Sequence, residues 1–246
     1  PMHMFLKELK LVNFKNYTEE KFYFSNKVVA ISGDNGMGKT NVLDAIYYLA
    51  MGKSYMVSND KNLVYTDQSF FRLDAIFEDA GGDAHLVIKY RLGAGKEIEL
   101  NGIRISKLAD HIGVIPIVFI TPDDVHNLLA GNEDRRVFIN NTMVQYDAAY
   151  LDALTLYNRN LKQRNALLKD FADKQYWDQD LIDVITSAMA APANYIYLKR
   201  KELTSSFSPV LQQFYEQISD GREKVALIYT SQLDTDDFLQ LSKSAQ

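Results

Sequence analysis

A glycine-rich turn constrains this sequence more than any other feature. It begins with Gly33 and, after four further residues, ends in Gly38-Lys39-Thr40. An apolar stretch at residues 28–32 runs directly into the turn, and apolar residues at three- and four-residue steps follow it as far as Gly52, where a helix stop is expected. Strand, loop and helix in this order are the setting in which such a turn binds phosphate. The sequence therefore predicts an α/β fold with a phosphate-binding loop.

Each residue type in this loop has a chemical task. Glycines let backbone N–H groups converge on phosphates, and the helix start adds positive potential. Lys39 can reach the terminal phosphates, and the Thr40 hydroxyl can ligate Mg²⁺ that is held by the nucleotide. A chance glycine-rich turn is the alternative, and the flanking strand and helix argue against it. The predicted nucleotide-binding residues are Gly33, Asp34, Asn35, Gly36, Met37, Gly38, Lys39, Thr40 and Asn41.

The composition indicates a folded protein without bulk basic charge. The chain has 246 residues, of which 47% are hydrophobic and 12% aromatic, enough for one large or two smaller cores. A net charge of -5 argues against nonspecific coating of nucleic acid, so DNA contact would need local patches. Cysteine, a secretory signal and a long apolar run are all missing. We expect a cytoplasmic protein with no membrane partner, and we interpret Pro1 as a cloning scar or processing remnant.

The first half of the chain has strand periodicity. Residues 5–12 form one short apolar strand. Alternating apolar residues over 69–105, with turn signals at Gly81-Gly82 and Asn101-Gly102, predict an antiparallel subsheet. Residues 116–120 are predicted to form a buried-type strand, and the Thr121 that follows them can cap a new helix.

The second half has helical periodicity. Pro192 is expected to kink or split the later helix, and residues 225–230 are predicted to form a last strand. Two apolar stripes mark the helices: Leu154, Leu161 and Leu168, then Leu181, Ile185 and Ala188. We predict an inserted helical lobe at residues 123–221, and a nucleotide-binding lobe at residues 1–122 to which residues 222–246 return.

The loop and the helix after it resemble a known family. Residues 33–46 are similar to the SMC-like branch of ABC ATPases. Five further segments resemble the RecF family of that branch, in the same order along the chain: 13–17 (Asn-Phe-Lys-Asn-Tyr), 119–124 (Phe-Ile-Thr-Pro-Asp-Asp), 134–139 (Asp-Arg-Arg-Val-Phe-Ile), 160–168 and 176–182.

The resemblance implies an ABC-type ATPase head with an antiparallel β subdomain and an inserted helical lobe. It implies ATP and Mg²⁺ as cofactors, and it adds Lys15 and Asn16 to the nucleotide-binding residues. ATP would close two subunits into a homodimer that clamps DNA near a single-strand gap or a single-strand/double-strand junction, and hydrolysis would release it. RecR is the implied partner, with a functional link to RecA loading in recombinational repair.

The sequence also departs from the family pattern. Lys15 stands where the family often has arginine, which loses the planar fork of a guanidinium. Asn140 stands where the family usually has an aspartate. Neither the acidic strand needed for hydrolysis nor the Ser-x-Gly-Gln signature occurs, and Asp123 and Asp124 suit the first turn of a helix better. We therefore expect this chain to bind ATP without hydrolysing it, and expect weak DNA-dependent ATPase activity of the full-length protein.

Local basic charge points to a DNA-binding surface on the helical lobe. Residues 153–201 carry eight Lys and Arg against five Asp, although two solvated helices would explain the same count. The candidate DNA contacts are Arg159, Lys162 and Arg164, with Lys53, Arg104 and Lys107 of the sheet lobe as the alternative surface.

Two other function classes stay open. One is a different SMC-like ATPase head, although such chains usually open into a very long coiled coil and the heptad stretch here is short. The other is a nucleotide-gated DNA-binding module with negligible turnover. Arg135 and Arg136 fit either a solvated helix face or a functional role, and Tyr157 and Trp177 are more typical of a core than of a base-stacking platform.

Overall fold

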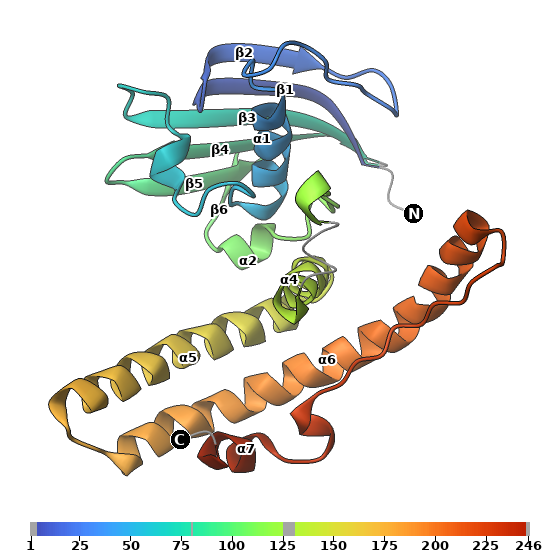
Figure 1. The fold of residues 1–246 in the computed structure, drawn as a ribbon. Helices are drawn as coiled ribbons and strands as arrows, with labels where there is room; N and C mark the ends of the chain where they lie inside the picture. The colour runs from blue at the N-terminus through green and yellow to red at the C-terminus, as the bar shows by residue number, and fades with distance from the viewer. Residues whose placement is uncertain (1–3, 80, 125–130, 245–246) are drawn as a thin grey trace. The chain divides into compact units, whose positions relative to one another are not determined.

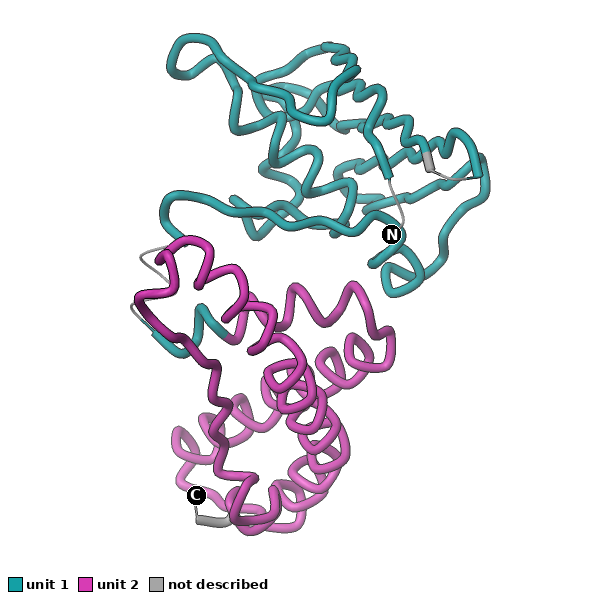
Figure 2. The backbone as a smooth tube through the Cα atoms, turned by 90° about the vertical axis from the view of Figure 1, so that its right-hand side faces the viewer, with its two compact units in different colours: residues 1–135 teal, residues 136–246 magenta. Residues whose placement is uncertain are grey.

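The computed structural model describes residues 4–79, 81–124 and 131–244 (Figure 1). The chain has an α/β fold and divides into two compact units, residues 1–135 and 136–246 (Figure 2). The boundary thus lies at a different place from the predicted one at residue 122. Residues 222–246 belong to the second unit, whereas the sequence suggested that they return to the first.

The first unit is built on a six-stranded antiparallel sheet. Its strand order is β2-β1-β3-β4-β5-β6, so each neighbouring pair is antiparallel. The strands are β1 (Phe5–Phe14), β2 (Tyr17–Tyr23), β3 (Phe70–Asp79), β4 (Gly82–Arg91), β5 (Gly95–Leu100) and β6 (Ile103–Ile105). The predicted strand at 5–12 and the predicted subsheet at 69–105 are confirmed. The sequence pattern did not predict β2, because this edge strand is mostly polar and exposed.

Helix α1 (Lys39–Met51) covers one face of this sheet (Figure 1). It ends at Gly52, whose φ of 62° closes the helix as predicted. The Tyr48 ring packs edge-on against Phe14 and Phe71, with centroids 6.5 and 5.4 Å apart, and all three side chains are buried. The alternation of buried and less buried residues on β1 and β3 supplies the rest of this core.

Two predicted strands in the first unit are wrong. Residues 28–32 and 116–120 are not strands, and Val28, Val118 and Ile120 are strongly exposed. Apolar β-branched residues suit a strand, but a strand also needs a paired neighbour, and none of the described segments pairs with these two. Between β1 and β3 lies η1 (Asp60–Leu63), and α2 (Leu108–His111) follows β6.

A helical turn begins at Thr121, as predicted, but the Thr121 hydroxyl does not cap it. That hydroxyl donates to Asp124 Oδ2 at 2.8 Å, and the same carboxylate accepts the Thr121 N–H at 2.5 Å, while the Asp124 N–H donates to the Thr121 carbonyl. The continuation at residues 125–130 lies outside the described residues.

The second unit is helical. Helix α4 (Asn132–Met143) spans the boundary, and α5 (Ala148–Lys174) and α6 (Gln179–Ser219) lie side by side in antiparallel directions (Figure 1). The N-terminal caps are Asp147 and Asp178, which accept from the backbone N–H of Tyr150 and Leu181 at 3.0 Å each. The elements η2 (Gln232–Asp234) and α7 (Phe238–Ser244) follow.

Pro192 does not split α6, which continues through it. Proline has no N–H to offer the carbonyl four residues earlier, and the buried Asn160 of α5 donates to that carbonyl, Ala188 O, at 3.4 Å. A neighbouring helix thus replaces the missing bond.

The predicted packing face of α6 is wrong by one residue. Leu181 and Ala188 are exposed, whereas Ile182 and Met189 are buried. The register is set by contact with α5, which a local periodicity does not contain.

Residues 222–231 run along α6 without forming the predicted strand at 225–230. The Gln212 side chain accepts the Val225 N–H at 2.6 Å, and the Ser208 hydroxyl accepts the Leu227 N–H at 3.1 Å. These bonds explain why this segment belongs to the second unit. By length and composition alone α6 could also cross a membrane, a weak test that core helices of globular proteins pass too.

Candidate functional site

The glycine-rich loop has the backbone that its sequence predicts. Gly36 and Gly38 have φ of 85° and 96°, in the left-handed region that favours glycine. Gly38 also lacks room for a side chain, because a Cβ there would lie 2.6 Å from Asn16 Nδ2. Residues 33–37 are exposed, and Lys39 begins α1. The first N–H groups of that helix therefore face a solvent-accessible loop.

The Lys39 ammonium lies inside the loop. It donates to the carbonyls of Gly33 at 2.6 Å and Asp34 at 2.7 Å. Both acceptors are neutral backbone oxygens, so the charge of Lys39 is not cancelled and can serve an anion bound at the loop.

The β1–β2 turn supports the loop from the side. Asn16 Oδ1 accepts from Asn41 Nδ2 at 2.7 Å, and Asn16 Nδ2 donates to the Met37 carbonyl at 3.3 Å. The Tyr17 hydroxyl donates to the same carbonyl at 3.4 Å. Burial raises the pKa of Tyr17, so this hydroxyl keeps its proton at neutral pH. The turn thus contacts the loop and the first turn of α1.

The side chain of Lys15 faces away from solvent. Its Nζ pairs with Asp44 Oδ2 at 2.7 Å, and the two side chains are 12% and 0% exposed. Asp44 lies on α1 and also accepts from the Ser54 hydroxyl at 2.7 Å and from the Tyr55 N–H at 2.8 Å. The predicted role of Lys15 in nucleotide binding stays a prediction, and the structure places its charge on a buried carboxylate.

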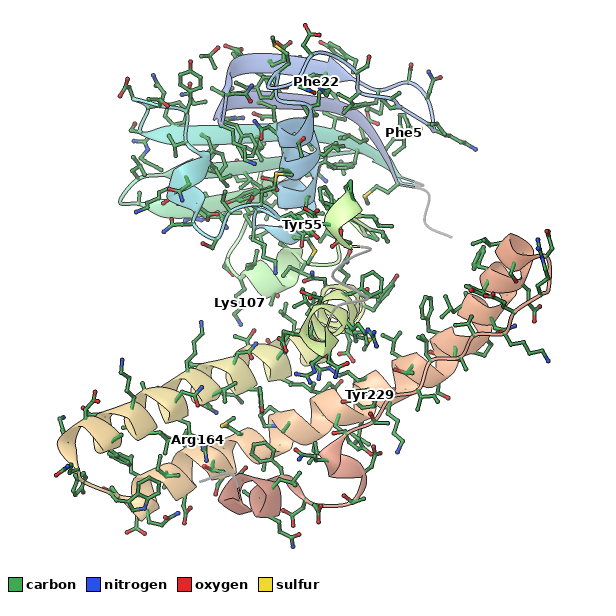
Figure 3. The ribbon with its side chains drawn as sticks, viewed as in Figure 1. Phe5, Phe22, Tyr55, Lys107, Arg164 and Tyr229 are labelled. Carbon is green, nitrogen blue, oxygen red and sulfur yellow. The ribbon has the colours of Figure 1, made fainter. Side chains whose placement is uncertain are left out.

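A hydrogen bond links Tyr55 to the helical turn at Thr121. The Tyr55 hydroxyl donates to Asp124 Oδ1 at 2.6 Å, and the Tyr55 ring packs on Phe119 with centroids 4.6 Å apart (Figure 3 labels Tyr55). Hydrogen bonds from Tyr55 and Thr121 outweigh the opposite effect of burial and lower the pKa of Asp124. Asp124 is therefore engaged locally as an ionised cap.

Thr40 is exposed in the first turn of α1, where a hydroxyl can reach a nucleotide-bound cation. Among the described residues, no group of three His, Cys, Asp or Glu side chains gathers to hold a metal ion.

The candidate DNA contacts on α5 separate into two groups. Arg159 and Lys162 are exposed. Arg164 is only partly exposed, and it donates to the Thr186 hydroxyl at 3.2 Å and to the Ser242 carbonyl at 3.4 Å (Figure 3). Arg164 therefore connects α5 to α6 and to the end of α7, which leaves it less available than the other two.

The alternative basic residues of the first unit all reach solvent. Lys53 and Lys107 are exposed, and Arg104 is 69% exposed beside Glu97 at 3.5 Å. Arg135 and Arg136 are exposed on α4.

The roles of Asp44, Tyr17 and Tyr55 could not be predicted from the sequence. Their partners lie 29, 20 and 69 residues away, so no local pattern brings them together. A charged residue on the otherwise apolar side of α1 was the one available signal for Asp44.

The chain is similar to proteins of known families. Residues 8–220 match the family model of an AAA domain. The DNA replication and repair protein RecF of Flavobacterium johnsoniae is 38% identical over 97% of the chain, and that of Phocaeicola vulgatus is 36% identical over 99%. The chain spans 66% and 65% of these two relatives.

Two solved structures are also similar to this chain. Both are of the recombination mediator protein RecF in the RecFOR pathway, one with ATP and one with ATPrS. They share 26% sequence identity with the chain and cover 98% of it, with TM-scores of 0.84 and 0.87. The chain covers 67% and 65% of their lengths. The chain therefore belongs to the AAA-domain family, in its RecF branch.

Proposed function

We propose that the loop at residues 33–41 binds ATP with Mg²⁺. The observation that carries this proposal is the loop itself, with left-handed glycines, an ammonium held only by neutral carbonyls, and a helix start behind it. Backbone N–H groups would hold the phosphates, Lys39 would exchange its two carbonyls for phosphate oxygens, and Thr40 would ligate the cation. A nucleotide-bound Mg²⁺ would neutralise phosphate charge. The similar structure with ATP supports this assignment.

Equilibrium binding of a fluorescent ATP analogue tests this proposal. Lys39→Ala removes the cation inside the loop, and we expect it to abolish measurable binding. Lys61→Ala is the matched control, because Lys61 is an exposed lysine of the same unit outside the loop. Equal affinity of Lys39→Ala and the parent chain would refute ATP binding at this loop.

We further propose a role in DNA repair as a recombination mediator that binds gapped DNA. The RecF relatives are DNA replication and repair proteins, and the similar structures are of a recombination mediator in the RecFOR pathway. An ATP-dependent homodimer, RecR binding, a link to RecA and a cytoplasmic location belong to this proposal. Steady-state phosphate release with and without gapped DNA separates an ATPase from a nucleotide-gated binding module.

The DNA surface that we propose is an exposed basic stripe on α5, formed by Arg159, Lys162 and Lys169. All three are exposed, and no carboxylate of the described chain lies within ion-pair distance of them. Lys169 replaces Arg164 of the sequence prediction, because Arg164 is hydrogen-bonded to Thr186. Three to four residues separate neighbours on one helix face, and Lys162 and Lys169 are seven apart.

A salt titration on a gapped duplex tests this surface. Replacing the three residues of the stripe with alanine should weaken binding at every salt concentration and lower the salt slope by about one unit per lost contact. The comparison variant carries alanine at Lys53, Arg104 and Lys107. Should that variant lose affinity while the stripe variant keeps it, the DNA surface belongs to the first unit.

A further inference from the structure

The Lys15 ammonium forms an ion pair with the Asp44 carboxylate, which needs a positive charge beside it because it is buried. Asp44 is fully buried, and Lys15 is its one cationic partner among the described residues. The hydroxyl of Ser54 and the N–H of Tyr55 complete its hydrogen bonds. An uncompensated buried carboxylate is strongly unfavourable, so moving Lys15 onto a phosphate would leave Asp44 without charge compensation.

The turn that carries Lys15 is fixed on both sides. Lys15 has φ of 52°, a left-handed conformation that is uncommon for a residue with a side chain. Its N–H donates to the Leu63 carbonyl at 2.7 Å, and the Tyr65 N–H donates to the Asn13 carbonyl at 2.8 Å. The backbone of the turn is therefore held against residues 63–65 while its lysine is held by α1.

The next residue of the turn, Asn16, contacts the loop directly. Asn16 bonds Asn41 and the Met37 carbonyl, and its amide fills the space that a side chain at residue 38 would need. A shift of the turn at Lys15 would therefore move the support of the phosphate-binding loop.

We propose that Lys15 is a positioning residue, which acts through Asp44 and Asn16 to hold the phosphate-binding loop in shape and does not contact the nucleotide. This inference rests on the proposed ATP binding at the loop. In the Lys15–Asp44 pair, each charge compensates the other. Removing one charge disturbs the conformation of the loop, and removing both charges restores that conformation.

A double-mutant cycle on the 246-residue chain tests the proposal. The variants are Lys15→Met, Asp44→Asn and the two combined, each measured for unfolding in urea and for binding of ATP and ADP with Mg²⁺. We expect each single variant to lose affinity, and within one variant the loss should be the same for ATP as for ADP. Its size should be roughly 5- to 150-fold, the range for coupling between separate sites. The double variant should recover most of this loss and most of the lost stability.

The matched control is the exposed ion pair of the same hairpin. Lys10 and Glu19 pair at 2.6 Å with side chains 37% and 65% exposed, so Lys10→Met and Glu19→Gln should leave affinity and stability near the parent values.

Three outcomes overturn the proposal. The first is a folded double variant that binds ATP as weakly as Lys15→Met. The second is a Lys15→Met variant that loses affinity for ATP but not for ADP, as expected of a ligand of the terminal phosphate. The third is a double variant that does not fold. Failure of ATP binding itself is distinguishable, because the parent chain would then match Lys39→Ala while the stability cycle in urea still reports the coupling.

Discussion

Both units contain a cation that is largely shielded from solvent, Lys15 in the first and Arg200 in the second, and the two charges are balanced differently. In the first unit Lys15 pairs with the buried Asp44 at 2.7 Å. In the second, Arg200 donates to the Tyr150 hydroxyl at 3.1 Å and to Asn140 Oδ1 at 2.9 Å. No carboxylate of the described chain lies within ion-pair distance of Arg200.

The difference follows from the two cations. An ammonium is a compact, strongly hydrated charge, which needs a carboxylate when it leaves water. A guanidinium is weakly hydrated and spreads its donors over a plane, so the neutral oxygens of Asn140 and Tyr150 can satisfy it. The first unit is therefore sensitive to charge removal near its loop, and the second is held by neutral hydrogen bonds.

The largest expected effect separates the two cations directly. Lys15→Met should destabilise the first unit by about 3–5 kcal/mol, because it leaves a buried carboxylate unpaired. Arg200→Met should cost the second unit about 1–3 kcal/mol, because it removes two hydrogen bonds but leaves only neutral groups, of which the Tyr150 hydroxyl still donates to Asn140 Oδ1 at 2.6 Å. Urea unfolding followed by hydrogen exchange of each unit measures both. Equal losses would show that the nature of the partner does not matter here.

A gain should follow from giving Arg200 an acid. Asn140→Asp places a carboxylate at the oxygen that already accepts from Arg200 at 2.9 Å, and it should stabilise the second unit by about 1 kcal/mol at neutral pH. Fluorescence of Trp177, the one tryptophan of the sequence, follows urea unfolding of this unit. Asn141→Asp, one residue further along α4, is the control. No gain at position 140 would mean that desolvation of the new carboxylate offsets the ion pair.

A smaller effect concerns the bond that Asn160 makes to the carbonyl freed by Pro192. Asn160→Ala should cost about 0.5–1.5 kcal/mol, the net value of one hydrogen bond. In a Pro192→Ala background the helix supplies its own donor, so the same substitution should cost less. A double-mutant cycle in urea measures the difference between the two costs. Identical costs in both backgrounds would show that Asn160 does not replace the hydrogen bond that Pro192 cannot make.

The smallest effect is a difference in acid sensitivity. Burial lowers the pKa of His111 in the first unit, so below about pH 6.5 the unfolded chain takes up a proton that the folded unit refuses, and stability falls. In the second unit, hydrogen bonds from Tyr197 and Lys201 lower the pKa of Asp234 to about 2. The ionised Asp234 carboxylate therefore stabilises the second unit above about pH 4, and this stabilisation is lost between about pH 4 and pH 2.

Urea unfolding measured at several pH values between about pH 7 and pH 5 checks this difference in acid sensitivity between the two units. The first unit should weaken in this window while the second should not, and His111→Gln should remove the change. Weakening of the second unit over the same window would contradict the assignment.

Sequence alone predicted what local patterns encode. The loop at 33–40, the end of α1 at Gly52 and the hairpin at Asn101-Gly102 depend on glycine geometry and neighbouring residues, and the structure confirms them. The strands predicted at 28–32 and 116–120 failed because strand formation depends on a partner that no local pattern specifies.

The candidate site shows the same limit. Its loop could be predicted, but the commitment of Lys15 to Asp44 could not, because the two residues meet only after α1 packs against the sheet. The inward turn of Arg164 likewise depends on Thr186 of another helix. Residue type predicted a charge at these positions, and tertiary contacts decided what each charge does.

Hydrogen exchange with and without ATP and Mg²⁺ tests the central claim most directly. Bound nucleotide should slow exchange at residues 33–41, which would hold the phosphates, and at residues 13–17, which support the loop. Exchange in the hairpin at 82–105 should not change, and Lys39→Ala should show no slowing anywhere. Unchanged exchange at 33–41 in the parent chain, or the same slowing in Lys39→Ala, would contradict an ATP site at this loop.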